Sequence, residues 1–166
     1  MPAGGILAVD SNATDMRYVG VRVALRDDGR YQADTEFAVE TQDEMWAAIS
    51  ESMKDRSVEL ALTPGLATMC PLDLSRRMTI WGYQEINRYT AIVKGMILEG
   101  RMAHNGKMTL TEQVNRAVAG RTQASITLTS QKSPGPIEQC RCMVAAAGMA
   151  AKPQSNIRKP MIGSSR

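Results

Sequence analysis

The opening of the chain places an acidic residue at the end of a buried strand. Residues 6–9 form an apolar run that follows two glycines and ends on Asp10. The run is too short for a helix and indicates a strand, and the polar residues 11–14 predict a turn after it. An acid on a rigid strand end can hold a divalent cation with little positional freedom. Many strands also end on an Asp that only caps a turn, and this segment alone leaves both interpretations open.

Two more strands follow at once. Residues 18–25 and 31–39 are rich in apolar and β-branched residues, and Asp27-Asp28-Gly29 between them is typical of a turn. Short connections join antiparallel neighbours, so the first three strands are expected to form a meander.

A helix and a fourth strand come next. Thr41 and Glu44 have the spacing of a capping box, and the apolar residues that follow predict a helix over residues 42–54. Residues 57–63 are expected to be a strand that stops at Pro64-Gly65, and residues 64–72 a loop.

The second half of the chain alternates between helical and extended patterns. Residues 72–99 carry a helical apolar stripe, interrupted at Gly82 and ending at Gly100, which predicts one long helix or two consecutive ones. Four further segments are predicted: a short strand at 107–110, a helix at 111–118, a strand at 125–129 and a helix at 137–151.

This order predicts an α/β fold with one domain over residues 1–151. A meander followed by α/β crossovers gives a mixed sheet, with antiparallel and parallel strands and helices on both faces. Residues 152–166 are polar and basic and lack core residues, so we expect a flexible C-terminal tail.

Charge is distributed unevenly. Residues 1–75 hold 13 Asp and Glu against 6 Lys and Arg, whereas residues 76–166 hold 4 acids against 14 bases. A basic C-terminal half is the electrostatic pattern of a protein that binds a polyanion, although charged runs are often only solvated surface.

Few other chemistries fit the composition. Three cysteines, including Cys140 and Cys142, and the lone His104 make a poor metal motif, and reduced thiols fit a cytosolic, nucleoid or organellar compartment. The sequence has no secretory pattern, no membrane-spanning apolar run and no phosphate-binding glycine motif.

The element order resembles the RuvC-type Holliday junction resolvases of the RNase H-like superfamily. The resemblance covers residues 4–151 and rests on the strand that ends at Asp10, on residues 18–21, 87–93 and 113–120, and on Glu138 at the start of the last helix. It implies an RNase H-like fold, an Mg²⁺- or Mn²⁺-dependent endonuclease, a DNA junction as substrate, and a homodimer. Asp10 and Glu138 would then be catalytic acids and metal ligands.

Two of the acids that the family carries are replaced. The fourth strand should end on a glutamate, where this chain has Thr63, and the partner of Glu138 three residues on is Arg141. Two-metal hydrolysis needs several anionic ligands. Glu59 on the fourth strand, or Asp73, would have to take over a ligand role. Alternatively, Arg141 pairs with a remaining acid, binds phosphate, or points to solvent.

The sequence therefore predicts a nucleic-acid-binding, RuvC-like protein with a degenerate metal site, for branched or duplex DNA. The alternatives are an active junction-resolving endonuclease and a non-catalytic viral or ribonucleoprotein subunit that uses the fold as a scaffold. The candidate phosphate contacts are Arg76, Arg77, Arg116, Arg121, Lys132, Arg141 and the bases of the tail.

Overall fold

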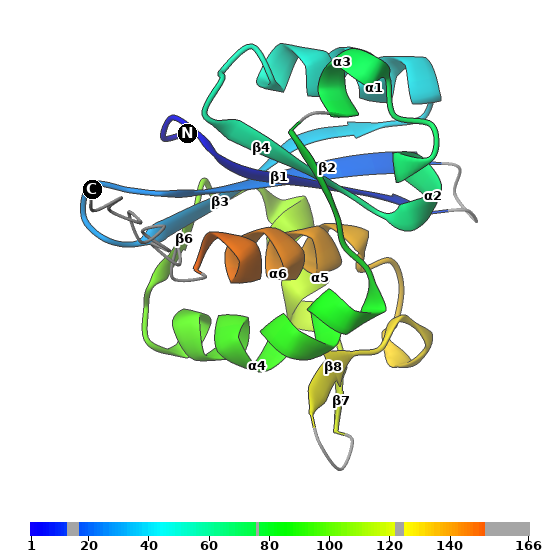
Figure 1. Cartoon of the computed structure of the whole chain (residues 1–166). Helices are drawn as coiled ribbons and strands as arrows, with labels where there is room; N and C mark the ends of the chain where they lie inside the picture. The colour runs from blue at the N-terminus through cyan, green and yellow to red at the C-terminus, as the bar shows by residue number, and fades with distance from the viewer. Residues whose placement is uncertain (13–16, 76, 122–124, 152–166) are drawn as a thin grey trace, which may run out of the picture.

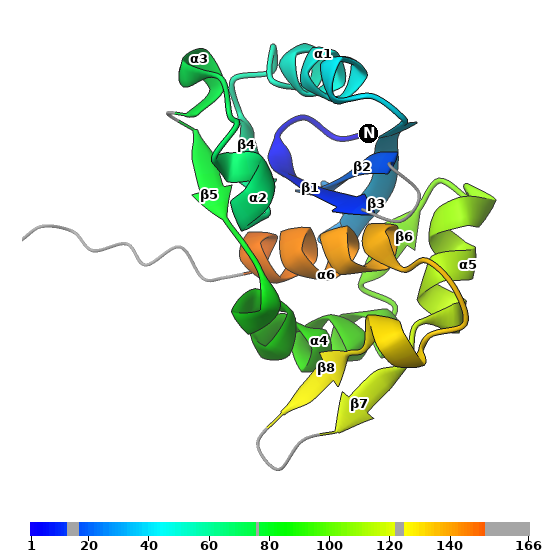
Figure 2. The same ribbon diagram turned by 90° about the vertical axis from the view of Figure 1, so that its right-hand side faces the viewer.

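The fold is a mixed sheet between two layers of helices (Figure 1). The computed structural model describes residues 1–12, 17–75, 77–121 and 125–151. Helices α1 (Gln42–Ser52), α2 (Pro64–Ala67) and α3 (Leu72–Ser75) lie on one side of the sheet. Helices α4 (Tyr83–Leu98), α5 (Met108–Arg116) and α6 (Glu138–Ala150) lie on the other, as Figure 2 also shows.

The sheet has six strands in the order β5-β4-β1-β2-β3-β6. Its strands are β1 (Gly5–Asn12), β2 (Arg17–Leu25), β3 (Tyr31–Val39), β4 (Val58–Leu62), β5 (Met78–Ile80) and β6 (Met102–His104). Strands β1, β2 and β3 form the predicted antiparallel meander. Strand β4 pairs in parallel with β1, and β5 in parallel with β4, so the predicted mixed sheet is confirmed.

Several local predictions were wrong. Residues 72–99 are not continuous helix, because the edge strand β5 separates α3 from α4. The expected loop at 64–72 contains α2, and the expected strand at 107–110 is the first turn of α5. Residues 11 and 12 continue β1 instead of starting a turn, and residues 13, 14 and 152–166 lie outside the described structure.

The capping box predicted for α1 is present. The backbone N–H of Glu44 donates to Thr41 Oγ1 at 3.3 Å, and that of Thr41 donates to Glu44 Oε2 at 3.1 Å. The helix buries Met45 and Ile49 against one face of the sheet, where Leu7 and Val9 of β1 also point. These side chains belong to one buried apolar cluster between the sheet and α1.

Helix α6 lies between the sheet and α4 and is buried on nearly every side. Its run of small residues at 145–148 suits this position, because small side chains allow neighbours to approach closely. A Cβ atom built on Gly148 would lie 2.1 Å from Cγ of Tyr89 on α4. Gly148 is therefore required by packing.

Beyond α5, a two-stranded sheet joins the layer of α4, α5 and α6, which we call the lower layer. Strands β7 (Ala119–Arg121) and β8 (Ile126–Leu128) pair antiparallel, and β8 lies against α4 (Figure 1). The 3₁₀ turn η1 (Ser130–Lys132) then leads to α6. None of the helices described here is long and apolar enough to cross a membrane.

Candidate functional site

The carboxyl end of β1 and the first turn of α6 bring Asp10, Glu138 and Arg141 together. Side chains alternate along β1, so Ala8 and Asp10 face α6 while Leu7 and Val9 face α1. Glu138 and Arg141 share one face of α6 because they are three residues apart. We call these three residues, with Asn12 and Arg17, the acid–arginine cluster.

The cluster is held by contacts between opposite charges. Arg141 Nη1 lies 3.4 Å from Asp10 Oδ2, and Arg17 Nη2 lies 4.0 Å from Glu138 Oε2. Asn12 Nδ2 donates to Glu138 Oε1 at 3.1 Å. Two acids therefore face two arginines, and their formal charges cancel. Of the alternatives for Arg141, pairing with a remaining acid is the one observed.

Asp10 is almost completely buried, with 4% of its surface exposed. Burial raises the pKa of this carboxyl above its ordinary value, and the nearby charge of Glu138 raises it further. The Arg141 guanidinium and the N–H of Ser11, which donates to Asp10 Oδ1 at 2.9 Å, lower the pKa but do not fully offset burial. The site thus keeps an acid that its surroundings do not favour in the charged form.

Two members of the cluster were not predicted from the sequence. Asn12 and Arg17 are register partners on β1 and β2, two residues beyond the Asp10–Val19 pair. The predicted hairpin could have indicated both residues, because residues next to the β1–β2 connection must lie close to Asp10. They were missed because the first strand was expected to end at Asp10, two residues before the end of β1.

The Trp81 ring packs against the guanidinium of Arg141. Its indole ring is fully buried, its Nε1 donates to the backbone oxygen of Ala61 at 3.1 Å, and the guanidinium carbon of Arg141 lies 5.8 Å from the ring centroid. A guanidinium over an indole face is attracted by the ring quadrupole. Because the Trp81 ring is buried and hydrogen-bonded, it limits the positions that the Arg141 guanidinium can take.

The two alternative acids are not brought to Asp10. Glu59 is exposed near the start of β4 and pairs with Ile6, four residues before Asp10 on the parallel β1. At about 3.3 Å per residue, this separation is about 13 Å along the strand. Asp73 lies on α3, whose Leu74 joins the core on the α1 side. Neither residue completes a ligand set with Asp10 and Glu138.

The residues present do not fit the Mg²⁺ or Mn²⁺ ions that the resemblance implies. Among the described residues, no group of three or more His, Cys, Asp or Glu side chains is placed to hold a metal ion. Asp10 and Glu138 are the best pair, and each already has an arginine beside it. A dication would have to compete with both guanidinium groups for only two carboxylates.

Cysteine and histidine do not add ligands. Burial raises the pKa of Cys140 to about 12 and that of Cys142 well above its ordinary value, so neither supplies a thiolate. His104 ends β6, and its Nδ1 accepts the N–H of Gly106 at 3.1 Å.

The other predicted phosphate contacts have different surroundings. Arg121 is exposed on β7 and Lys132 on η1, and Arg116 lies in the last turn of α5, 4.0 Å from Glu112. Arg77 instead donates to the backbone oxygens of Met53 and Asp55, at 2.6 and 3.3 Å. Arg76 lies outside the described structure.

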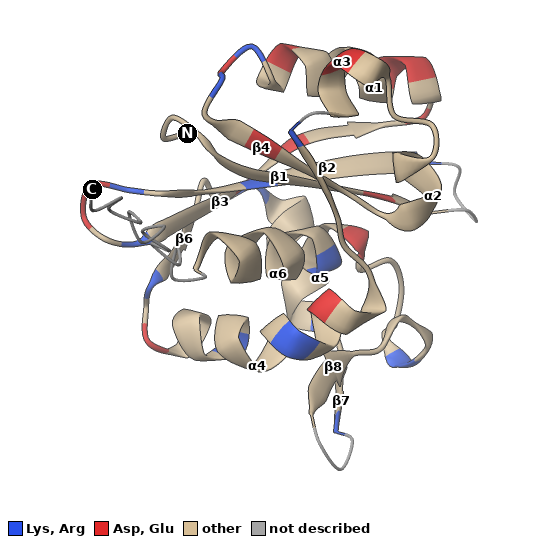
Figure 3. Cartoon of the chain, in the orientation of Figure 1, with Lys and Arg blue, Asp and Glu red and all other residues tan. Residues whose placement is uncertain are grey.

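Charge divides between the two helical layers (Figure 3). Acidic residues stand out on α1 and α3, whereas basic residues mark α4, β7 and the segment before α6. Residues 83–150 hold eight Lys and Arg against four Asp and Glu. The acid–arginine cluster thus borders the more basic layer.

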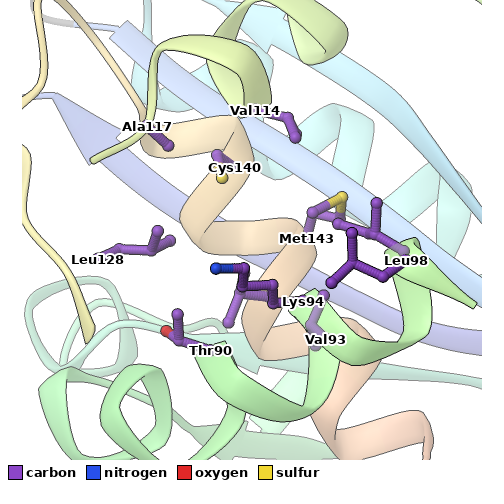
Figure 4. Close-up of a pocket in the computed structure, with 11 residues that line it drawn as sticks. Thr90, Val93, Lys94, Leu98, Val114, Ala117, Leu128, Cys140 and Met143 are labelled. Carbon is purple, nitrogen blue, oxygen red and sulfur yellow. The ribbon is translucent and has the colours of Figure 1, made fainter. Parts of the chain in front are cut away.

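An apolar pocket of about 270 Å³ lies between α4, α5 and α6 (Figure 4). Val93, Val114 and Met143 line it, with Lys94 among them. Its lining also includes Thr90 and Cys140, but burial raises the pKa of the Cys140 thiol to about 12, and the lining holds no histidine or carboxylate that could act as its base. The acid–arginine cluster is therefore the stronger candidate site.

The comparisons with known proteins give one structural relative. The crystal structure of the HK97 bacteriophage large terminase superposes with a TM-score of 0.72 at 16% sequence identity, over 90% of this chain and 40% of that one. No protein-family model and no curated protein matches the sequence. The superposition confirms the predicted RNase H-like fold but not the RuvC type.

Proposed function

We propose that this protein binds nucleic acid at the acid–arginine cluster, with Arg141 where an active enzyme of this fold would hold metal. The contact of Arg141 with Asp10 at 3.4 Å carries the proposal. A guanidinium offers several donors in a plane and suits phosphate oxygens. Contact with the nucleic-acid backbone would then need no metal ion.

The charge of the lower layer supports a polyanionic ligand. Arg116, Arg121 and Lys132 belong to this layer and are the further phosphate contacts that we propose. Such contacts set orientation without reading sequence, and they make affinity strongly dependent on salt.

The finer proposal is a RuvC-like protein that recognises branched or duplex DNA. It rests on the sequence resemblance that places Asp10 and Glu138 at the positions of catalytic acids. A homodimer on a four-way junction belongs to the same proposal.

The first alternative is an active, Mg²⁺- or Mn²⁺-dependent endonuclease with Asp10 and Glu138 as its ligands. The two arginines beside these acids count against it. The second alternative is a non-catalytic subunit of a viral assembly. The structural likeness to a bacteriophage large terminase and the exposed Ile97, Leu98 and Met108 favour that alternative.

A combined gel-shift and cleavage assay separates these functions. A four-way DNA junction and a linear duplex are each mixed with the full chain in EDTA or in Mn²⁺. We expect salt-sensitive binding in EDTA and no cleavage in Mn²⁺. Arg141→Gln should raise the dissociation constant about tenfold, as expected for lost charge-assisted hydrogen bonds.

Arg30→Gln is the matched control, since it removes the same charge from the β2–β3 turn at the far end of the sheet. It should leave binding unchanged. Mn²⁺-dependent cleavage that Asp10→Asn abolishes would establish the endonuclease instead. An absence of both binding and cleavage would refute the nucleic-acid function and favour the assembly subunit.

A further inference from the structure

A polar pocket lies beside Arg141, on the side of the lower layer. Its volume is about 330 Å³, and it lies between the start of α4, strand β8 and turn η1. Its polar lining residues are Tyr83, Thr127, Thr129, Ser130, Gln131 and Arg141. None of the residues that line it is acidic.

This lining suits an anion. Three hydroxyls from residues 127–130, the Gln131 amide and the Tyr83 phenol can all donate hydrogen bonds, and Arg141 adds a positive charge. An acidic side chain at the wall would repel an anion, and there is none. The pocket is about large enough for one tetrahedral oxyanion with some water.

Two lining residues have donors that no other described residue accepts. Thr127 is 6% exposed, and its Oγ1 is buried without a hydrogen-bond partner in the described part of the chain. Arg141 makes the contact with Asp10 and lies over Trp81, which leaves most of its five N–H donors available. Buried hydroxyls without partners are uncommon, so Thr127 indicates a site completed by another molecule.

We propose that this pocket binds a phosphate group, with Arg141 and Thr127 as its main donors. The inference deepens the proposed function, on which it rests for the source of the phosphate, a nucleic-acid backbone. Arg141 would then bridge Asp10 and the phosphate, with one side of its guanidinium toward each.

A second pocket indicates the path that a bound nucleic-acid strand would take. It lies on the other side of the contact between α4 and β8, and Gln84, Asn87 and Arg88 line it. Asn87 Oδ1 is buried without a hydrogen-bond partner among the described residues, and Arg88 is exposed. A nucleic-acid strand that crosses this contact would meet Arg141 and then Arg88.

Inorganic phosphate tests the first pocket directly. Sodium phosphate is titrated into the full chain at constant ionic strength against sodium chloride, and the Arg141 Nε–Hε and Thr127 amide signals are followed by NMR. We expect saturable shifts with phosphate and none with chloride. Thr127→Val and Arg141→Gln should each weaken phosphate binding about tenfold, whereas Thr127→Ser, which keeps the hydroxyl, should bind normally.

A labelled oligonucleotide in EDTA tests the source of the phosphate. Thr127→Val, Arg141→Gln and Arg88→Gln should all weaken its binding, and Arg88→Gln should leave inorganic phosphate binding unchanged. Equal shifts with phosphate and chloride, or normal phosphate binding by both pocket variants, would overturn the inference. If phosphate binds as expected and the oligonucleotide does not, the pocket stands and the proposed nucleic-acid function fails.

Discussion

Asp10 opposes folding when it is charged. It is buried at the end of β1, and its single arginine partner lies 3.4 Å away and remains partly exposed to water. Burial dominates, so the pKa of Asp10 is raised in the folded state. An acid that destabilises its own fold is typical of a functional position, where stability is lost in exchange for activity or binding.

Asp10→Asn should become more stabilising relative to wild type as pH rises. A raised native pKa means that the protonated carboxyl favours folding below the ordinary value of 3.8, and this contribution is lost as pH rises through the native pKa. Asn has nearly the same shape and carries no charge at any pH. Urea unfolding of both proteins between about pH 4 and pH 7 measures the difference.

Asp28→Asn is the matched control with the opposite sign. Hydrogen bonds from Arg30 lower the pKa of Asp28, so wild type gains stability from this group as pH rises above the lowered pKa. The Asp28→Asn variant should therefore lose stability relative to wild type as pH rises towards the ordinary value of 3.8, so its unfolding is measured below pH 4 as well. A flat or falling pH dependence for Asp10→Asn would contradict the account of the buried acid.

Among the elements, α6 sets the geometry of the site. Its first turn carries Glu138 and Arg141, and its small residues let it lie between the sheet and α4. Further contacts fix its start, since Thr35 Oγ1 donates to Gln139 Oε1 at 2.8 Å and the N–H of Gln139 donates to Gln113 Oε1 at 2.8 Å. A rigid helix position is what holds Arg141 against Asp10.

Gly148→Ala should destabilise the protein by about 1–3 kcal/mol, as overpacking of a close helix contact does. The added methyl group would overlap the Tyr89 ring, and α6 and α4 would have to separate. Thermal or urea unfolding followed by circular dichroism measures the change in the free energy of unfolding.

Gly95→Ala on α4 is the matched control. Its new Cβ would meet only Glu99 Oε1, at 4.0 Å, so it should stabilise the helix by up to about 1 kcal/mol. Equal effects of the two substitutions would show that the α4–α6 contact is looser than described.

The sequence predicted elements well where their pattern was long. The meander, α1 and α6 were found because they carry strong periodicity or a capping box. Strands β5, β6 and β7 were missed because each has three residues and no clear alternation, whereas the equally short β8 was predicted from the alternating residues 125–129. Met78 and Trp81 also matched a helical stripe, so β5 was taken for helix.

At the scale of the whole molecule, the sequence predicted the fold and the two acids. It did not predict that an arginine lies beside each of these acids. Asp10 was identified from its place at the end of a strand, and Glu138 and Arg141 from the family resemblance, while Arg17 and Trp81 entered only through tertiary contacts. In this RNase H-like fold, Arg141 lies beside the buried Asp10 and Arg17 lies beside the half-buried Glu138. We infer that these two arginines make the site independent of metal.

Calorimetric titration with Mn²⁺ of wild type, Arg141→Gln and Arg141→Glu measures whether the site binds metal. Arg141→Glu would place a third carboxylate beside Asp10 and on the same helix face as Glu138. We predict no saturable heat for wild type at millimolar Mn²⁺, little for Arg141→Gln, and clear binding for Arg141→Glu. Saturable Mn²⁺ binding by wild type that Asp10→Asn removes would contradict the account and restore the metal-dependent enzyme.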